Sequence, residues 1–464
     1  MKCKVISEKD NVAVLLESEG KIPAGHKIAL KDIAEGEEII KYSHRIGRAT
    51  QKIRKGEWVH SHNMKTALDE TFSYEYHPVH KAFEKNAGFF LGYRRKGRRA
   101  GIRNDIYIIP TVGCVNSVAK EIADDFQGKK IEGIDGVYAL THPYGCSQLG
   151  EDHADFRKLL VSVSQNPNAA GVLFVGLGCE NNGIGGIREQ LQGLPSEHIR
   201  FINCQDAEDE VMAGKEKVEE LIARYATKRE KTELGELAIG LKCGGSDGFS
   251  GITANPLVGR ISDRLISYGG SAVLTEVPEM FGAEQQLMNR CESREVYEKY
   301  REMIVKFKRY YTENGFPVYE NPSPGNRAGG ITTLEEKSLG CVEKGGSADI
   351  VDVIEYADRI KRKGLSVLNA PGNDLIASTA LAAAGCQIVL FTTGRGTPFA
   401  TFVPTLKIAT NRSLAKKKSN WIDFDAESGN EDELWEKMLK VCSGERCKAE
   451  DKREIAYFKR GVTL

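Results

Sequence analysis

The sequence predicts an α/β fold in which a small N-terminal β domain precedes two α/β domains with mostly parallel sheets. Three observations predict this fold. Short β-rich runs separated by Gly and Pro turns fill roughly the first 66 residues. From Asp105 onward, continuous apolar runs end in Gly or Pro and precede helical segments. Such uninterrupted runs are typical of strands buried on both faces of a parallel sheet.

Shifts in composition along the chain predict its domain boundaries. The first segment closes around the motif WVHSHN, and the next one is polar and aromatic without a clear period. The charged stretch 227–236 separates the two α/β domains. The expected division is a small β domain, a linker, a second domain and a C-terminal domain, at residues 1–66, 67–92, 93–236 and 237–464.

Individual elements follow from the apolar patterns. Strands are expected at 11–16, 27–30, 105–110, 136–140, 171–176, 200–203, 238–241, 272–275, 366–369 and 387–391. Helices are expected at 151–160, 209–229 and 294–314. Ser293 is the predicted N-cap of the last helix, and Gly315 its stop.

Composition excludes several classes of partner. Lys and Arg total 65 and balance 65 Asp and Glu, whereas nucleic-acid binding usually leaves a basic excess. No apolar stretch is long enough to span a bilayer, and the N-terminus MKCKVISEKD lacks a signal-peptide core. The 11 cysteines form no CxxC pair, which favours reduced thiols over a disulfide framework or zinc ribbon. We therefore expect a cytoplasmic protein that acts on a small molecule.

Polar and soft side chains follow several expected strands, at the sheet edge where open α/β folds bind ligands. A cysteine beside a glycine recurs at four such exits, at Cys114, Cys146, Cys179 and Cys243. One such cysteine is usually a small core residue, but four in like positions indicate a function. Asn116 in the same loops is a candidate for substrate binding, and His142 is a further candidate metal ligand.

His60 and His62 form the strongest single metal motif. Residues i and i+2 of a strand point to the same face, so two imidazoles there can bind one cation. The alternative is a pair of exposed or structural histidines. His153 lies in an acidic helix start and is expected to be a surface residue.

Two Gly-rich segments, 325–338 and 391–398, are suited to an anion. Backbone N–H groups and a guanidinium in the second segment can hold a carboxylate, through Thr393, Gly394, Arg395 and Thr397. The alternative for each is a tight Gly turn. Neither GxxxxGK[ST] nor GxGxxG after a strand occurs, which excludes a P-loop and a dinucleotide fingerprint. Lys337 is a candidate base, and an ion pair with its acidic neighbours fits it about as well.

Together, these motifs resemble the altronate/galactarate dehydratase family over nearly the whole chain. The matching blocks include HPYGCSQLGED, GLGCENN, LKCGGSDGFSGITANP, TEVPEMFGAE, GGITTLEEKSLG and TTGRGTPFATFVPTLKIATN, with WVHSHN closing an SAF-like domain. The resemblance implies metal-dependent β-elimination of water from a sugar acid, and the ending YFKRGVTL favours the altronate branch. Galactarate dehydratase, sulfolactate lyase and a non-catalytic sugar-acid-binding protein are the alternatives.

The resemblance also implies roles for individual residues. A divalent metal, Fe²⁺ before Mn²⁺, is expected on His60 and His62, completed by Cys146 or Glu276. Arg395 and Thr393 would hold the substrate carboxylate, and Lys337 or His142 would move the proton. An iron–sulfur cluster on Cys114, Cys146 and Cys179 is the rival cofactor. No membrane or nucleic-acid partner is expected. Homo-oligomerisation is left open, and with it a site shared between subunits.

Overall fold

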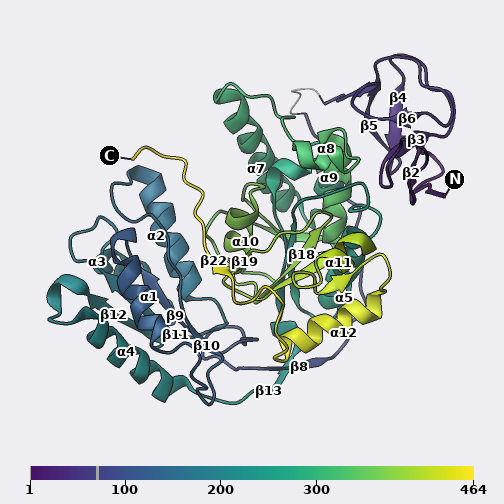
Figure 1. Ribbon diagram of the computed structural model, residues 1–464. Coiled ribbons are helices and arrows are strands. Elements are labelled where there is room, and N and C mark those ends of the chain that lie inside the picture. Colours follow the sequence, from purple (N-terminus) through teal and green to yellow (C-terminus); the bar gives the residue numbers. More distant parts are fainter. Residues whose placement is uncertain (1, 69–72, 464) are drawn as a thin grey trace.

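A computed structural model describes residues 2–68 and 73–463, and it confirms the predicted α/β class (Figure 1). The N-terminal β domain has two antiparallel sheets. The first contains β1 (Cys3–Lys4), β2 (Val12–Leu15), β3 (Lys27–Ala29) and β6 (Trp58–Val59). The second contains β4 (Glu38–Lys41), β5 (His44–Ala49) and β7 (Met64–Lys65). Ile33, Ile39 and Ile46 are buried between them.

The N-terminal domain docks on α8 (Pro324–Ala328) and α9 (Leu334–Val342), beside which it lies in Figure 1. A buried ion triad joins the two parts. Glu336 accepts from Lys27 Nζ at 2.7 Å and from Lys41 Nζ at 2.9 Å, and all three side chains are at most 2% exposed. Burial alone would raise the pKa of Glu336, but the two lysines outweigh it and hold that pKa below its ordinary value.

Replacing Glu336 with glutamine is expected to lower the free energy of unfolding by about 3–5 kcal/mol, because two buried ammonium groups lose their carboxylate. Urea unfolding and limited proteolysis near residue 68 would measure the loss and the release of the N-terminal domain. Glu335→Gln is the matched control, since Glu335 accepts from Thr66 Oγ1 at 2.9 Å and pairs with no lysine in the described residues. Equal destabilisation by both changes would contradict this role of the triad.

The second domain is built on a parallel four-stranded sheet in the order β10-β9-β11-β12. Its strands are β9 (Asp105–Pro110), β10 (Gly136–Ala139), β11 (Ala169–Gly176) and β12 (Ile199–Asn203). Its helices are α1 (Asn116–Asp124), α2 (Gly150–Ser164), α3 (Ile184–Gln190) and α4 (Glu210–Tyr225). One face of the sheet packs against α1 and α4, and the other packs against α2 and α3. β11 is buried throughout, as its apolar sequence predicts.

The C-terminal domain contains a seven-stranded parallel sheet in the order β16-β17-β15-β14-β18-β20-β21. Its strands are β14 (Ala238–Cys243), β15 (Ser271–Leu274), β16 (Ile350–Ile354), β17 (Gly364–Leu368), β18 (Ile388–Thr393), β20 (Thr405–Ala409) and β21 (Phe424–Asp425). Its remaining helices are α5 (Ala254–Ser267), α6 (Glu284–Met288), α7 (Arg294–Glu313), α10 (Asp374–Ala383), α11 (Arg412–Lys417) and α12 (Glu431–Cys442). Ser293 caps α7 as predicted, since its side chain accepts from Val296 N.

The second and C-terminal domains share one hydrophobic core. Phe156 and Leu160 of α2 belong to the same buried cluster as Leu381 of α10. The chain end then returns to the second domain, where the Tyr457 hydroxyl donates to Asp152 Oδ1 at 2.8 Å. In Figure 1 this tail runs upward between the two domains. The second and C-terminal domains are therefore held together by this shared core and by the returning C-terminal tail.

Two sequence predictions require correction. The helix expected at 209–229 ends at Tyr225, because Ala226 takes an extended conformation. Residues 89–92 of the expected linker form β8 (Phe89–Gly92), which pairs antiparallel with β13 (Glu230–Glu233). Part of that linker, residues 69–72, lies outside the described residues. Within 2–68 and 73–463, no helix is both long and apolar enough to cross a membrane.

Candidate active site

The largest of the described cavities, about 870 Å³, opens at the carboxyl ends of the C-terminal sheet. Cys243 at the end of β14, Glu279, Lys337 and Asn326 form part of its wall. Tyr144 of the second domain and Tyr457 of the returning tail also line it. The cavity is therefore a cleft between the two larger domains, at the sheet edge where α/β folds bind ligands.

Two cysteines and one glutamate meet at the wall of this cleft, which Cys243 and Glu279 line and behind which Cys341 is buried. Cys243 ends β14, Glu279 lies in the 3-10 helix η4 (Val277–Met280), and Cys341 lies on α9. The two sulfurs are 3.4 Å apart, and Glu279 Oε2 lies 3.4 Å from Cys243 Sγ and 3.1 Å from Cys341 Sγ. Among the described residues, this is the one group of three metal-type donors within mutual reach.

Three lysines surround this trio, namely Lys337, Lys344 and Lys242, the last of which donates to Cys243 O. Lys337 Nζ lies 2.8 Å from Glu279 Oε1, and it donates to Asn321 Oδ1 at 3.0 Å and Asn326 Oδ1 at 3.2 Å. Lys344 Nζ lies 2.8 Å from Cys243 Sγ. The ion-pair partner of Lys337 is Glu279, and neither of its acidic neighbours Glu335 and Glu336.

Glu276, a predicted metal ligand, lies directly behind the trio. It pairs with Lys242, and its Oε2 lies 3.6 Å from Cys243 Sγ and 3.3 Å from Lys344 Nζ. Its backbone is left-handed, with φ 72°. That conformation costs a non-glycine residue of the order of 1–3 kcal/mol and tends to occur at functional sites. The strain directs the carboxylate back toward the end of β14, where it accepts from Cys243 N at 3.1 Å.

Burial and charge determine the protonation of the cleft. Burial alone would lower the pKa of Lys337, but the Glu279 carboxylate outweighs it and raises that pKa above its ordinary value. Burial would likewise raise the pKa of Glu279, yet the lysines, Lys337 foremost, lower it to about 2. The hydrogen bond that Cys341 shares with Cys243, together with burial, raises the pKa of Cys341 above the ordinary thiol value. At neutral pH, Lys337 is therefore an ammonium, Glu279 a carboxylate and Cys341 a thiol.

The trio has the spacing of metal ligands. An ion with four tetrahedral bonds of about 2.0–2.3 Å holds its ligands roughly 3.3–3.8 Å apart, close to the distances here. Without an ion, three lysines balance three carboxylates, namely Lys242, Lys337, Lys344, Glu276, Glu279 and Asp374. A divalent ion on two thiolates would leave the cluster neutral. The donors thus fit one soft divalent metal.

The second Gly-rich segment contributes partly to the cleft. Thr397 lines the cavity, whereas Arg395 is exposed beside it and donates to Gly325 O at 3.4 Å. Thr393 is buried, and its hydroxyl accepts from Gly396 N at 2.8 Å. Gly394 is required by packing, because a Cβ there would lie 2.3 Å from Asp247 Cγ. Of the four predicted residues of this loop, Thr397 and Arg395 therefore lie nearest a ligand in the cleft.

His60 and His62 do not lie on a strand as predicted. β6 ends at Val59, and His60 to Asn63 form a turn. The Asn63 side chain closes this turn by accepting from His60 N at 2.9 Å and donating to Trp58 O at 2.8 Å. Both imidazoles pack against the Trp58 ring, and His60 Nε2 lies 2.9 Å from Arg327 O.

The remaining predicted residues lie in the second domain. His142 is buried, with Nε2 2.7 Å from Pro110 O and Nδ1 accepting from Tyr144 N. Burial lowers the pKa of His142 to about 4, so it is a neutral, fully bonded imidazole. Asn116 Nδ2 donates to His142 O at 2.8 Å. Cys146 is exposed and lies 3.5 Å from Asn181 Oδ1. The predicted metal set of His60, His62, Cys146 and Glu276 is thus not brought together among the described residues.

Sequence reasoning missed most of the metal-type donors of the cleft. Cys243 was recognised as a strand-exit cysteine, but Glu279 and Cys341 were not singled out. Cys341 follows Lys337 by four residues, a spacing that places both on one face of α9 and could have indicated it. Glu279 lies three residues after the strained Glu276, and no local pattern distinguishes it from an ordinary acidic residue.

Three models of one protein family match the three domains of this chain. The model of the D-galactarate/Altronate dehydratase C-terminal domain matches residues 234–463. Those of the D-galactarate dehydratase/Altronate hydrolase second domain and the Altronate/galactarate dehydratase SAF domain match 92–226 and 2–67.

Three relatives align over most of their length. Altronate dehydratase of Bacillus subtilis (strain 168) is 51% identical, over 97% of this chain and 94% of its own. Altronate dehydratase of Escherichia coli (strain K12) is 48% identical, over 98% and 94%. Galactarate dehydratase (L-threo-forming) of Escherichia coli (strain K12) is 31% identical, over 91% and 87%. The chain therefore belongs to the altronate/galactarate dehydratase family.

Proposed function

We propose that this protein is an altronate dehydratase, a hydro-lyase that converts D-altronate to a 2-keto-3-deoxy sugar acid. The observation that carries the proposal is the identity of 51% and 48% to two altronate dehydratases along nearly the whole chain. The cleft supports it with a volume of about 870 Å³ and polar walls suited to a hydroxylated acid. Its free cysteines suit a reducing cytoplasm, where we place the enzyme.

The proposed reaction is a β-elimination. The proton α to the carboxylate leaves, and the β-hydroxyl departs as water after accepting a proton. Lys337 is the proposed donor, because it holds a proton at Nζ and faces the cleft. Asp374, which lines the cleft and accepts from Lys242 at 2.9 Å, is the proposed acceptor of the α-proton. Arg395 and Thr397 are positioned to hold the substrate carboxylate at the rim.

We propose that Cys243, Glu279 and Cys341 hold the divalent metal of the enzyme. When bound, such an ion supplies positive charge for the enediolate that forms as the α-proton leaves. Two sulfur donors favour Fe²⁺ over Mn²⁺, which prefers oxygen ligands. Zn²⁺ binds such donors more tightly than Fe²⁺ does, so we expect added Zn²⁺ to displace iron and inhibit turnover. The sequence-based assignment of the divalent metal to His60 and His62 stays a prediction.

A second candidate cofactor is an iron–sulfur cluster held by the other three strand-exit cysteines. Cys114, Cys146 and Cys179 are all exposed, which is unusual for this residue type. They follow three adjacent strands, and their loops are joined by bonds from Gly113 N to Tyr144 O and from Asn182 N to Gly145 O. An iron–sulfur cluster here predicts a brown, oxygen-labile protein with acid-labile sulfide. A single ion in the cleft predicts a colourless, chelator-sensitive protein.

The function is tested by incubating anaerobically Fe²⁺-loaded protein with D-altronate, galactarate and sulfolactate, and assaying the 2-keto-3-deoxy product or released sulfite. We expect kcat/KM for altronate to exceed the others by at least about 100-fold, since a second charged terminus would be left unpaired in a site built for a hydroxyl. Preference for galactarate or sulfolactate would move the protein to that branch of the family. Binding without turnover of any substrate would contradict the proposal.

A further inference from the structure

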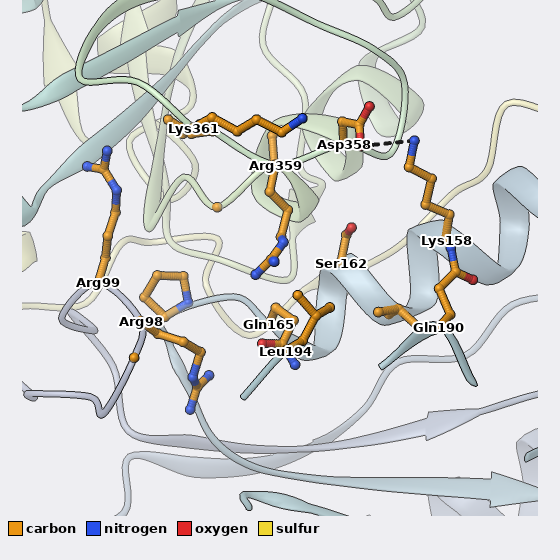
Figure 2. A pocket seen from close by; sticks show the side chains of 16 residues that line it. Arg98, Arg99, Lys158, Ser162, Gln165, Gln190, Leu194, Asp358, Arg359 and Lys361 are labelled. Atoms are coloured by element: carbon orange, nitrogen blue, oxygen red, sulfur yellow. Dashed lines mark ion pairs between the residues drawn. The ribbon is translucent and has the colours of Figure 1, made fainter. Parts of the chain in front are cut away.

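A second cavity, of about 430 Å³, lies between the second and C-terminal domains and shares no lining residue with the cleft (Figure 2). One wall comes from α2 and the segment 97–99. The other comes from the segment 358–361, which follows β16, and from Gly385 after α10. Neither the predicted substrate residues nor the metal-type donors reach this cavity.

Positive charge dominates the lining of this cavity. Five cationic side chains line it, namely Arg98, Arg99, Lys158, Arg359 and Lys361. Among the lining residues in the described part of the chain, Asp358 is the one carboxylate, and it already pairs with Lys158 Nζ at 2.9 Å. Among the described residues that line the cavity, five cationic side chains therefore face one carboxylate.

Two of the arginines form no ion pair with a carboxylate among the described residues. The Arg359 guanidinium points into the cavity and makes no hydrogen bond or ion pair within the described residues (Figure 2). Arg98 bonds to the backbone oxygens of Asn166 and Ala169, both at 3.1 Å, and to no carboxylate. Burial, with Arg95 and Arg359 nearby, lowers the pKa of Arg98 to about 9. Asp358 acts on Arg359 but already pairs with Lys158, so these half-buried cations outnumber their anions. Buried charge without a full set of partners is costly, and the protein gains by binding an anion here.

We propose that this cavity binds a small metabolite that carries at least two negative charges. Guanidinium groups accept carboxylate and phosphate bidentately, and the volume admits a ligand of six or seven carbons. The cationic groups come from both domains, so the ligand bridges them. α2 connects the two sites, because Lys158 and Ser162 line this cavity while Asp152, near its start, holds Tyr457 of the cleft. The inference concerns a separate site and does not depend on the proposed function.

Binding is measured by calorimetry on the full-length, metal-loaded protein at low ionic strength. The probes are inorganic phosphate, 6-phosphogluconate, galactarate and gluconate, so that the phosphate and dicarboxylate sources are distinguished and gluconate is the singly charged control. The variants are Arg359→Met, the cleft variant Lys337→Met and the matched surface control Arg260→Met, whose parent side chain pairs with Glu431 outside the cavity. Thermal unfolding of each variant confirms that it is folded.

We expect 6-phosphogluconate or galactarate to bind at least tenfold more tightly than gluconate and to raise the melting temperature. Arg359→Met should weaken this binding at least tenfold, whereas Lys337→Met and Arg260→Met should leave it within twofold. The preferred probe identifies the anionic group. Equal binding by wild type and Arg359→Met, equal loss in Arg260→Met, or no binding of any doubly charged probe at millimolar concentration would overturn the proposal.

Discussion

Replacing Lys337 with methionine is expected to lower kcat for altronate dehydration by about 10²–10⁴-fold, the usual range for loss of a general acid. Lys337 is the proton-bearing group that faces the cleft, and Glu279 keeps it charged. Lys337→Arg keeps the charge but holds its proton too tightly to donate it, so it should restore substrate affinity and not kcat. Steady-state kinetics on D-altronate separates these two effects.

The single change also leaves Glu279 buried without its cation, which destabilises the protein on its own. A Lys337→Met/Glu279→Gln double variant removes both charges and is expected to recover the melting temperature, and it serves as a stability control because Glu279 is also a proposed metal ligand. If the double variant regained kcat together with stability, Lys337 would be a structural residue only. Near-wild-type turnover by Lys337→Met would equally exclude it as the proton donor.

Replacing Cys341 with serine is expected to weaken Fe²⁺ binding by about 10–100-fold and to lower turnover at limiting metal by a similar factor. Serine keeps the shape of the side chain but removes a soft, ionisable ligand. Competition with a chelator measures the affinity directly, independently of activity. Cys291→Ser is the matched control, because Cys291 is buried, belongs to no metal-type trio among the described residues, and its sulfur contacts Leu287 O.

Metal binding at this site should also depend on pH. The pKa of Cys341 is raised, so the thiol keeps its proton at neutral pH until a metal displaces it. Each unit of rising pH is therefore expected to tighten Fe²⁺ binding by at least about tenfold below that pKa, since Cys341 releases its proton when it binds the ion. A pH-independent dissociation constant between pH 6.5 and 8 would show that Cys341 is not a ligand. Unchanged affinity in Cys341→Ser would show the same.

Local patterns predicted the elements well because their causes are local. The apolar run 105–110 is β9 at the same bounds, and the buried faces of β11 follow from its uninterrupted apolar sequence. Ser293 caps α7 as its position before the amphipathic run requires. Where the prediction failed, a side chain changed the local geometry. Asn63 bonds to the backbone on both sides of the turn and removes His60 from the strand.

The sequence by itself determined the fold class, the family and the principle that ligands bind at strand ends, because each follows from periodicity or from long matching blocks. Only the tertiary structure decided which of those ends form one site. Cys243, Glu279 and Cys341 come from a strand, a 3-10 helix and an α-helix, and the parallel sheet brings their ends to one edge. Such contacts depend on packing between distant segments, and no local spacing encodes them. The same packing made Lys337 an ammonium, since its pKa is governed by Glu279, 58 residues away in the chain.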